Sequence, residues 1–150
     1  MTVLARDIMK MSISSFLSSK IESTLWQECF YKVYKQEKKR SNKHPERKEQ
    51  CINIINEGIT YYNYLLRSIK STNDSANLCS YKFLIHLGDL NRYLAIEIQL
   101  QESQPIQKLD SFKAAESFYQ EAIQLNPSVG HSFHQQAVLA SFFLFSSIDF

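Results

Sequence analysis

The stretch "FLIHLGDLNRYLA" (residues 83–95) places a glycine inside an apolar helical pattern. Glycine in a helix interior costs about 1 kcal/mol relative to alanine, so its presence there needs a reason. Because Gly88 has no β-carbon, a partner helix can come close to it, and tight packing against Ala115 or Ala122 would offset the lost helix propensity. The stretch therefore predicts a helix that packs closely against a second helix.

Apolar residues recur at steps of three or four along most of the chain, which is typical of amphipathic helices. Helices are predicted over 22–40, 45–70 and 78–101. The clearest is 45–70, whose apolar face carries Ile52, Ile55, Ile59, Tyr62, Leu66 and Ile69. This pattern predicts an all-α fold of antiparallel helical hairpins.

A polar, proline-containing segment precedes the last two predicted helices. The segment "QESQPIQKLDS" (101–111) predicts a loop, and Asp110 or Ser111 at its end could cap the next helix. That helix is predicted over 111–126, and a further one over 128–145. The residues of this last helix expected to face inward are Val129, Phe133, Ala137 and Ala140.

Composition limits the function classes that the chain can serve. It has 150 residues, 44% of them hydrophobic, which suits one compact domain. The net charge of +2 gives little reason to expect a nucleic-acid binder from the overall field. Lys and Arg are concentrated between Lys32 and Lys48, and we interpret this run as a solvated helix end and loop.

The sequence lacks the motifs of nucleophilic, metal-dependent and nucleotide-dependent enzymes. His131 and His134 lie three residues apart, but no third metal ligand accompanies them. The cysteines, Cys29, Cys51 and Cys79, are far apart and are expected to be buried thiols. Charged residues interrupt the apolar N-terminus, so we expect neither a signal peptide nor a membrane span there. We expect a non-enzymatic cytoplasmic protein that can shuttle to the nucleus and has no metal, cofactor or membrane contact.

A repeat signal appears in the second half of the chain. Ala115, Tyr119, Ala122 and Pro127 have the spacing of the packing positions in the second helix of a tetratricopeptide unit. Gly88 suits the first helix of such a unit. Because the chain between the two helices is longer than a standard repeat allows, the pattern predicts an elongated, irregular hairpin with these residues at the helix contact.

Arg92 lies on the same side of its predicted helix as Gly88 and Asp89. One interpretation is a local ion pair between Asp89 and Arg92 on a wet surface. The other is an anion site, in which the carboxylate holds the guanidinium so that its planar fork can meet a phosphate. The residue pattern leaves both interpretations open.

Several segments together resemble a known family. The stretches "GDLNRYLAIE" (88–97) and "SFYQEAI" (117–123) resemble segments of 14-3-3 proteins. A wider resemblance is to the 14-3-3-like tetratricopeptide domain of the nonsense-mediated mRNA decay effectors and the telomerase-associated Ever Shorter Telomeres proteins. It rests on "LWQECFYKV" (25–33), "FLIHLGDLNRY" (83–93) and "AAESFYQEAIQLNPSVGHSFHQQAVLA" (114–140).

The resemblance implies a phosphoserine pocket. Arg92 matches the arginine of that pocket in the family, and Tyr93 is its neighbour. The second basic residue of the family pocket is a lysine after an aromatic residue. Aligning Phe30 with that aromatic residue places Tyr31 at the lysine position, and Lys32 is one residue further, about 100° around the helix. Lys32 reaches the pocket only if the alignment shifts by one.

The resemblance covers 22–140, preceded by an N-terminal extension or first helix (1–21). The stretch "SFFLFSSIDF" (141–150) is a divergent apolar tail, so we expect a domain that is C-terminally truncated relative to the family. The family implies an adaptor that binds the phosphorylated decay helicase. The alternative is a scaffold that pairs with a paralogous 14-3-3-like subunit or a telomerase component without reading phosphate. A weaker possibility is RNA contact through Lys38, Lys39, Arg40 and Lys43.

Overall fold

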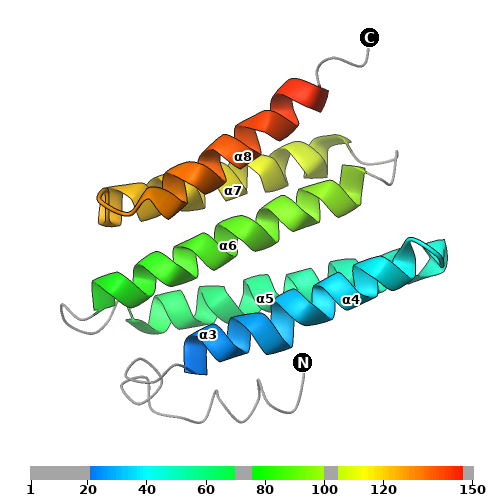
Figure 1. Ribbon diagram of the computed structural model, residues 1–150, viewed down its shortest axis with the longest axis horizontal. Helices are drawn as coiled ribbons and strands as arrows, with labels where there is room; N and C mark the ends of the chain where they lie inside the picture. Colours follow the sequence, from blue (N-terminus) through cyan, green and yellow to red (C-terminus); the bar gives the residue numbers. More distant parts are fainter. Residues whose placement is uncertain (1–20, 70–75, 100–104, 147–150) are drawn as a thin grey trace. The chain divides into compact units, whose positions relative to one another are not determined.

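A computed structural model describes residues 21–69, 76–99 and 105–146. Within these ranges all regular secondary structure is helical and no strand occurs, which confirms the predicted all-α class (Figure 1). The chain divides into two compact units, Met1–Ser71 and Thr72–Phe150. The predicted domain bounds, 22–140 with a tail after them, stay a prediction.

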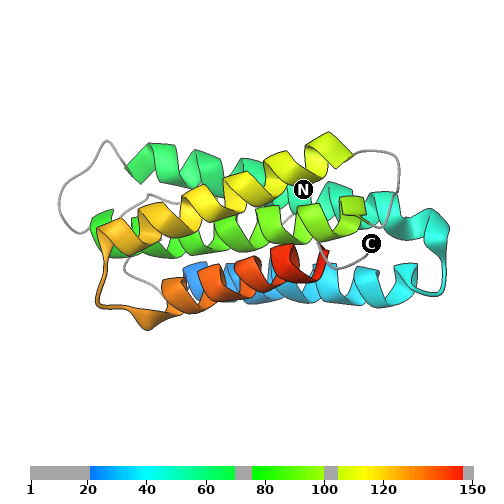
Figure 2. The same ribbon diagram turned by 90° about the horizontal axis from the view of Figure 1, so that it is seen from above.

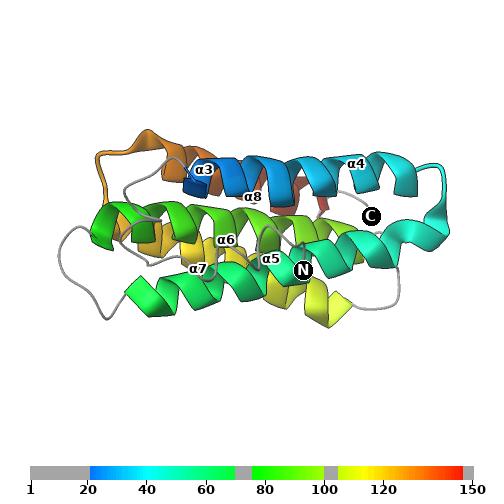
Figure 3. The same cartoon turned by 90° about the horizontal axis from the view of Figure 1, so that it is seen from below.

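The described part of the first unit, residues 21–69, is an antiparallel pair of long helical runs (Figure 3). Its first helical run has three consecutive parts and is followed by a short 3₁₀ turn and the returning helix. The elements are α3 (Ile21–Leu25), the π-helical segment η1 (Trp26–Tyr31), α4 (Lys32–Ser41), η2 (Pro45–Arg47) and α5 (Lys48–Ile69). The predicted helices over 22–40 and 45–70 are therefore present.

Aromatic side chains fill the contact between the two helical runs. Phe30 packs on Tyr61 and Tyr62 with ring centroids 5.8 and 5.6 Å apart, and Trp26 meets Tyr62 edge-on at 5.9 Å. Such tilted and edge-on pairs add to the stability that burial of the rings provides. Of the apolar face predicted for α5, four residues are buried and Ile52 and Ile59 are half-buried; the buried four are Ile55, Tyr62, Leu66 and Ile69.

The π-helical segment between Trp26 and Tyr31 was not predicted, and it changes the phase of the helix. Leu25 and Tyr34 are nine residues apart, which in an uninterrupted α-helix places them about 180° apart. Both are nevertheless buried. A π-helical turn holds one residue more than an α-helical turn, so the buried face shifts by one position along the sequence.

The second unit contains three consecutive antiparallel helices, and α7 packs along α6 (Figure 2). They are α6 (Ala76–Gln99), α7 (Pro105–Leu125) and α8 (Gly130–Ser146). The predicted loop over 101–111 is too long, because α7 already begins at Pro105. Proline is favoured in the first turn of a helix, so it starts this helix, and Asp110 and Ser111 lie inside the helix instead of capping it.

The face of α8 that packs inward differs from the predicted one. Ser132 and Leu139 are buried, whereas Val129 is half-buried and Phe133 is 47% exposed. Ala137 and Ala140 are exposed as well. The small Ser132 fits this contact because its hydroxyl donates to the backbone carbonyl of Val129 at 3.2 Å, so its burial leaves no unpaired hydroxyl.

The turn between α7 and α8 contains Pro127, as the repeat spacing predicts. Asn126 closes α7 by donating its backbone N–H to the carbonyl of Ala122, and Ser128 donates its hydroxyl to the Asn126 side chain at 2.8 Å. None of the described helices is long and apolar enough to cross a membrane.

Candidate functional site

The close contact between α6 and α7 is made by Gly88 and Tyr119. A β-carbon placed on Gly88 would lie under 3.0 Å from three atoms of the Tyr119 ring. Real side chains essentially never come that close, so only glycine fits at this position without a shift. The predicted close approach of a second helix at Gly88 is present, and the nearest atoms belong to Tyr119. Ala115 and Ala122, the predicted partners, are fully buried in α7 on either side of Tyr119 in the sequence, and their contact with Gly88 stays a prediction.

Tyr119 also joins Asp89 and Arg92 into one hydrogen-bonded group. Its hydroxyl donates to Asp89 Oδ1 at 2.7 Å. Arg92 donates from Nη2 to the same carboxylate oxygen at 3.1 Å and from Nε to the Tyr119 hydroxyl at 3.3 Å. Charge-assisted bonds of this kind are stronger than neutral ones. The guanidinium is therefore held by two residues on two helices.

This group is largely buried, although Arg92 keeps some contact with solvent. The side chains of Arg92 and Asp89 are only 11% and 9% exposed. The interpretation of the pair as a solvent-exposed surface bridge is therefore wrong, and the carboxylate does hold the guanidinium as the second interpretation requires. Breaking a buried pair by removing one partner costs far more than breaking a surface pair, because a charge is left buried.

Burial and charge set the proton affinities in this group. Burial lowers the pKa of Arg92, but the neighbouring Tyr119 and Asp89 oxygens outweigh it, so the pKa lies above its ordinary value. Burial raises the pKa of Tyr119, and the Asp89 carboxylate raises it further. Arg92 stays charged and Tyr119 stays a neutral donor over the whole neutral range.

Arg92 retains hydrogen-bonding capacity beyond these contacts. A guanidinium carries five N–H groups, and two of them meet Tyr119 and Asp89. The N–H groups on Nη1 have no acceptor among the described residues. The guanidinium carbon also lies 4.8 Å from the ring centroid of Tyr93, a cation–π distance. Tyr93 is therefore beside Arg92, where the resemblance places it.

Lys32 belongs to the first unit and is exposed. It forms an ion pair with Glu28, one helical turn earlier. The structure does not test whether Lys32 and Arg92 serve one pocket, so the shared role of the two residues stays a prediction. Tyr31 is half-buried and stacks on Trp26 with ring centroids 6.3 Å apart.

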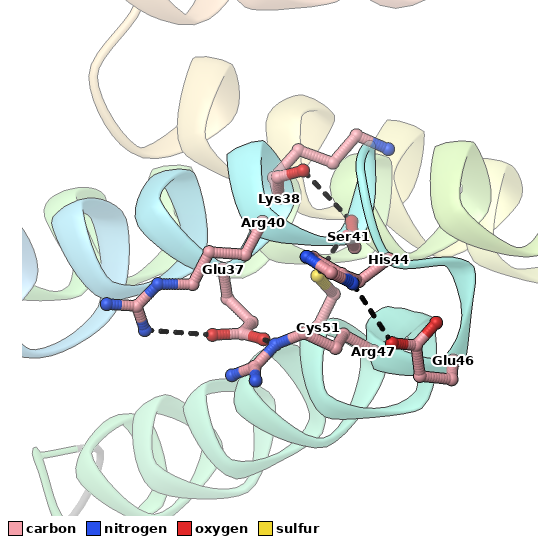
Figure 4. Close-up of polar contacts among 8 residues, drawn as sticks. All are labelled: Glu37, Lys38, Arg40, Ser41, His44, Glu46, Arg47 and Cys51. Atoms are coloured by element: carbon pink, nitrogen blue, oxygen red, sulfur yellow. Dashed lines mark hydrogen bonds and ion pairs between the residues drawn. The ribbon is translucent and has the colours of Figure 1, made fainter.

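A second polar group lies where α4 and α5 meet (Figure 4). The Glu37 carboxylate sits between the guanidinium groups of Arg40 and Arg47 and bonds to both. The hydrogen bond and charge of Arg47, helped by Arg40, hold the pKa of Glu37 below its ordinary value against the opposing effect of burial. Cys51 donates its thiol to the Ser41 hydroxyl beside it at 3.7 Å.

No group of His, Cys, Asp or Glu in the described ranges could hold a metal ion. Cys29 and Cys51 are buried and Cys79 is half-buried, and none of these three residues forms a disulfide. The arrangement around Arg92 is a guanidinium, a carboxylate and a phenol hydroxyl that hydrogen bonds hold together.

The hydroxyl of Tyr119 is the functional group that sequence reasoning missed. The repeat spacing identifies position 119 as a packing residue, and it is indeed fully buried. A buried tyrosine usually finds a hydrogen-bond partner for its hydroxyl. Because Tyr119 contacts Gly88, this expectation points to Asp89 and Arg92, which follow that glycine.

One protein-family model matches the chain: the Est1 DNA/RNA binding domain, over residues 115–143. The matched segment runs from the middle of α7 through the turn into α8, and it includes Tyr119. No curated protein and no solved structure matches significantly.

Proposed function

We propose that the chain is a non-enzymatic adaptor that binds phosphoserine peptides through Arg92. The observation that carries the proposal is the fixed guanidinium: Asp89 and Tyr119 orient it, Tyr93 lies beside it, and its Nη1 group has no acceptor among the described residues. An arginine oriented before binding loses little side-chain freedom when a phosphate arrives. Such a residue can form a bidentate pair with a phosphate.

The family match supports a more specific partner. The Est1 model includes Tyr119, one of the two residues that hold Arg92. Together with the resemblance to 14-3-3-like domains, this favours a role in nonsense-mediated mRNA decay, with the phosphorylated decay helicase as the partner. The adaptor would then act in the cytoplasm and shuttle to the nucleus.

Lys32 is the residue that we propose for the second basic position of the family pocket. In the family the second basic residue occupies the position where this chain has Tyr31. Because the segment Trp26–Tyr31 holds one residue more than an α-helix would, Lys32 takes the angular place that position 31 would have in an uninterrupted helix.

A second candidate function is a scaffold that pairs with a paralogous 14-3-3-like subunit or a telomerase component without reading phosphate. The observation in its favour is charge compensation. Asp89 neutralises Arg92 at 3.1 Å in a nearly buried pair, and such a pair has reduced attraction for a further anion. The two functions differ in whether binding depends on phosphate.

A peptide titration distinguishes them. A serine peptide from the decay helicase, phosphorylated or unmodified, is titrated against the wild type, Arg92→Gln and Arg92→Lys. The matched control is Arg67→Gln, because Arg67 is exposed on α5. Arg92→Gln should lose the charge-assisted contact to the phosphate. This loss corresponds to roughly 2–3 kcal/mol, so the affinity for the phosphorylated peptide should fall about 30- to 150-fold.

Circular dichroism of each variant separates lost binding from lost folding. Arg92→Lys keeps the charge but not the planar fork, so we expect it to fold and to bind between the wild type and Arg92→Gln. Equal affinity of the wild type for both peptides would refute phosphate reading and favour the scaffold. Weakening by Arg67→Gln that matches Arg92→Gln would show that only net charge matters.

A further inference from the structure

The first unit has a hollow at the end of α4, outside the family match and independent of Arg92. It has a volume of about 300 Å³. The residues that line it belong to the end of α4 and the turn that follows, and all are exposed: Gln36, Lys39, Arg40, Lys43 and His44. Pockets for small ligands have volumes of roughly 300 to 1,000 Å³, so this hollow has room for a side chain of a partner but not for a folded surface.

The inside of the hollow differs chemically from its rim. The surface inside it is almost entirely carbon. Lysine and arginine have long aliphatic stems, so the stems form the walls while the charged ends stay in water at the rim. The hollow is therefore apolar inside and positively charged around its opening.

Two cations at the rim are available to an outside anion. Within the described part of the chain, Lys39 and Lys43 form no ion pair. The acids nearest to them in the sequence are already engaged. The buried Glu37 bonds to two arginines (Figure 4), and Glu46 pairs with His44 at 3.2 Å. The positive charge of the two lysines is therefore not neutralised locally.

The kind of partner follows from the contrast between the walls and the rim. Carbon walls offer a phosphate no hydrogen-bond donors, and the end of α4 carries partial negative charge on its carbonyl oxygens. The polar edges of a nucleobase would be left unpaired against carbon. A phenylalanine ring has no polar atoms, and a cation at the rim can lie over its face. The inside therefore suits an aromatic side chain, and the rim suits carboxylates beside it.

We propose that the hollow at the end of α4 binds an acidic peptide segment of a partner protein through one phenylalanine side chain. The ring enters the hollow, and carboxylates of the flanking residues pair with Lys39 and Lys43. Exposed ion pairs contribute little each, so the partner is recognised by the ring and the acids together. The peptide needs no phosphate.

The test is fluorescence anisotropy of the whole chain with a labelled peptide that has one phenylalanine between runs of aspartate and glutamate. Because this probe contains no phosphate, it does not test the site at Arg92. In the hollow variant, Lys39→Gln with Lys43→Gln, the affinity should fall about 2- to 30-fold, as expected for the loss of two exposed ion pairs. Replacing the phenylalanine of the probe with alanine should weaken binding to the wild type about tenfold, because the burial of roughly half a ring is lost.

Two further variants separate the hollow from general charge and from folding. The matched control, Arg67→Gln with Lys113→Gln, removes the same charge from exposed positions on α5 and α7 and should bind the probe as the wild type does. The reversed variant, Lys39→Glu with Lys43→Glu, should lose the acidic probe. It should bind a probe with lysines in place of the acids more tightly than the wild type does, and such a gain cannot come from unfolding.

Three outcomes would overturn the proposal. An equal loss of affinity in the matched control would show a general charge effect. Unchanged affinity for the alanine probe would show that no ring enters the hollow. If labelled oligouridine binds more tightly than the acidic probe and loses affinity in the hollow variant, the hollow belongs to a nucleic-acid surface instead.

Discussion

The ring of Tyr119 occupies the space in which any residue other than glycine at position 88 would place its β-carbon. The same tyrosine donates to Asp89 and accepts from Arg92. The helix-weakening glycine and the position of the arginine therefore have one cause. The tyrosine can reach the acid and the arginine only because the glycine lets its ring lie against α6.

Replacing Gly88 with alanine should destabilise the protein although alanine favours helices. Overpacking against the Tyr119 ring costs about 1–3 kcal/mol, and the gain in helix propensity returns only about 1 kcal/mol. Urea unfolding followed by circular dichroism measures the difference. Gly130→Ala is the control, because a β-carbon there meets nothing within 4 Å, and it should be neutral or stabilising.

Removing the hydroxyl of Tyr119 should loosen Arg92 while leaving the helix contact in place. Tyr119→Phe keeps the ring on Gly88 but removes the donor to Asp89 and the acceptor for Arg92. A buried partner left unsatisfied costs about 1–3 kcal/mol. Tyr64→Phe, at a position that is 50% exposed, should change the free energy of unfolding by less than about 0.5 kcal/mol. Equal effects of the two substitutions would contradict the assigned hydrogen bonds.

The ion pair between Glu37 and Arg47 should make stability depend on pH. Arg47 lowers the pKa of Glu37, so the stabilisation is complete above the ordinary glutamate pKa and is lost as the pH falls through the lowered pKa. Glu37→Gln should therefore melt at a lower temperature than the wild type at neutral pH. The difference in melting temperature between the wild type and Glu37→Gln should narrow below about pH 4. Glu116→Gln, an exposed position on α7, should show no such narrowing.

The observed orientation of α8 predicts which of its apolar residues carries stability. Leu139 is 2% exposed, and its replacement by alanine should cost about 2–5 kcal/mol. Phe133 is 47% exposed, and Phe133→Ala should stay within about 0.5 kcal/mol of the wild type. Thermal and urea unfolding of both variants test this. If Phe133→Ala lowered the free energy of unfolding more than Leu139→Ala, the face of α8 predicted from periodicity would be the one that packs inward.

Periodicity predicts the helices well where one face is apolar and the other is charged. The helix over 45–70 is such a case, because Glu49, Asn53 and Arg67 mark its exposed side. It fails for the face of α8, since between Gly130 and Ser146 the sequence has no Asp, Glu, Lys or Arg to mark an outer side. Prolines are also ambiguous signals. Pro105 suggests a loop in the sequence, but it begins α7, where the missing backbone N–H costs nothing.

The candidate site was predictable in part. Spacing along one helix places Asp89 beside Arg92, because residues three apart share a side. It cannot show that the pair is buried, since that depends on Tyr119, 27 residues further along the chain. Similarly, no residue type between Trp26 and Tyr31 predicts a π-helical turn. The angular position of Lys32 therefore could not be predicted by counting residues along an α-helix.

That turn also makes one place in the first helical run tolerant of a change in length. Deleting Gln27, which is exposed, would convert the turn to ordinary α-helix and leave the flanking buried faces in the phase they have now. The same deletion inside α5 would rotate everything beyond it by about 100° and pull Tyr61 and Tyr62 out of the core. Relatives that gain or lose a single codon in this run should therefore do so between positions 26 and 31.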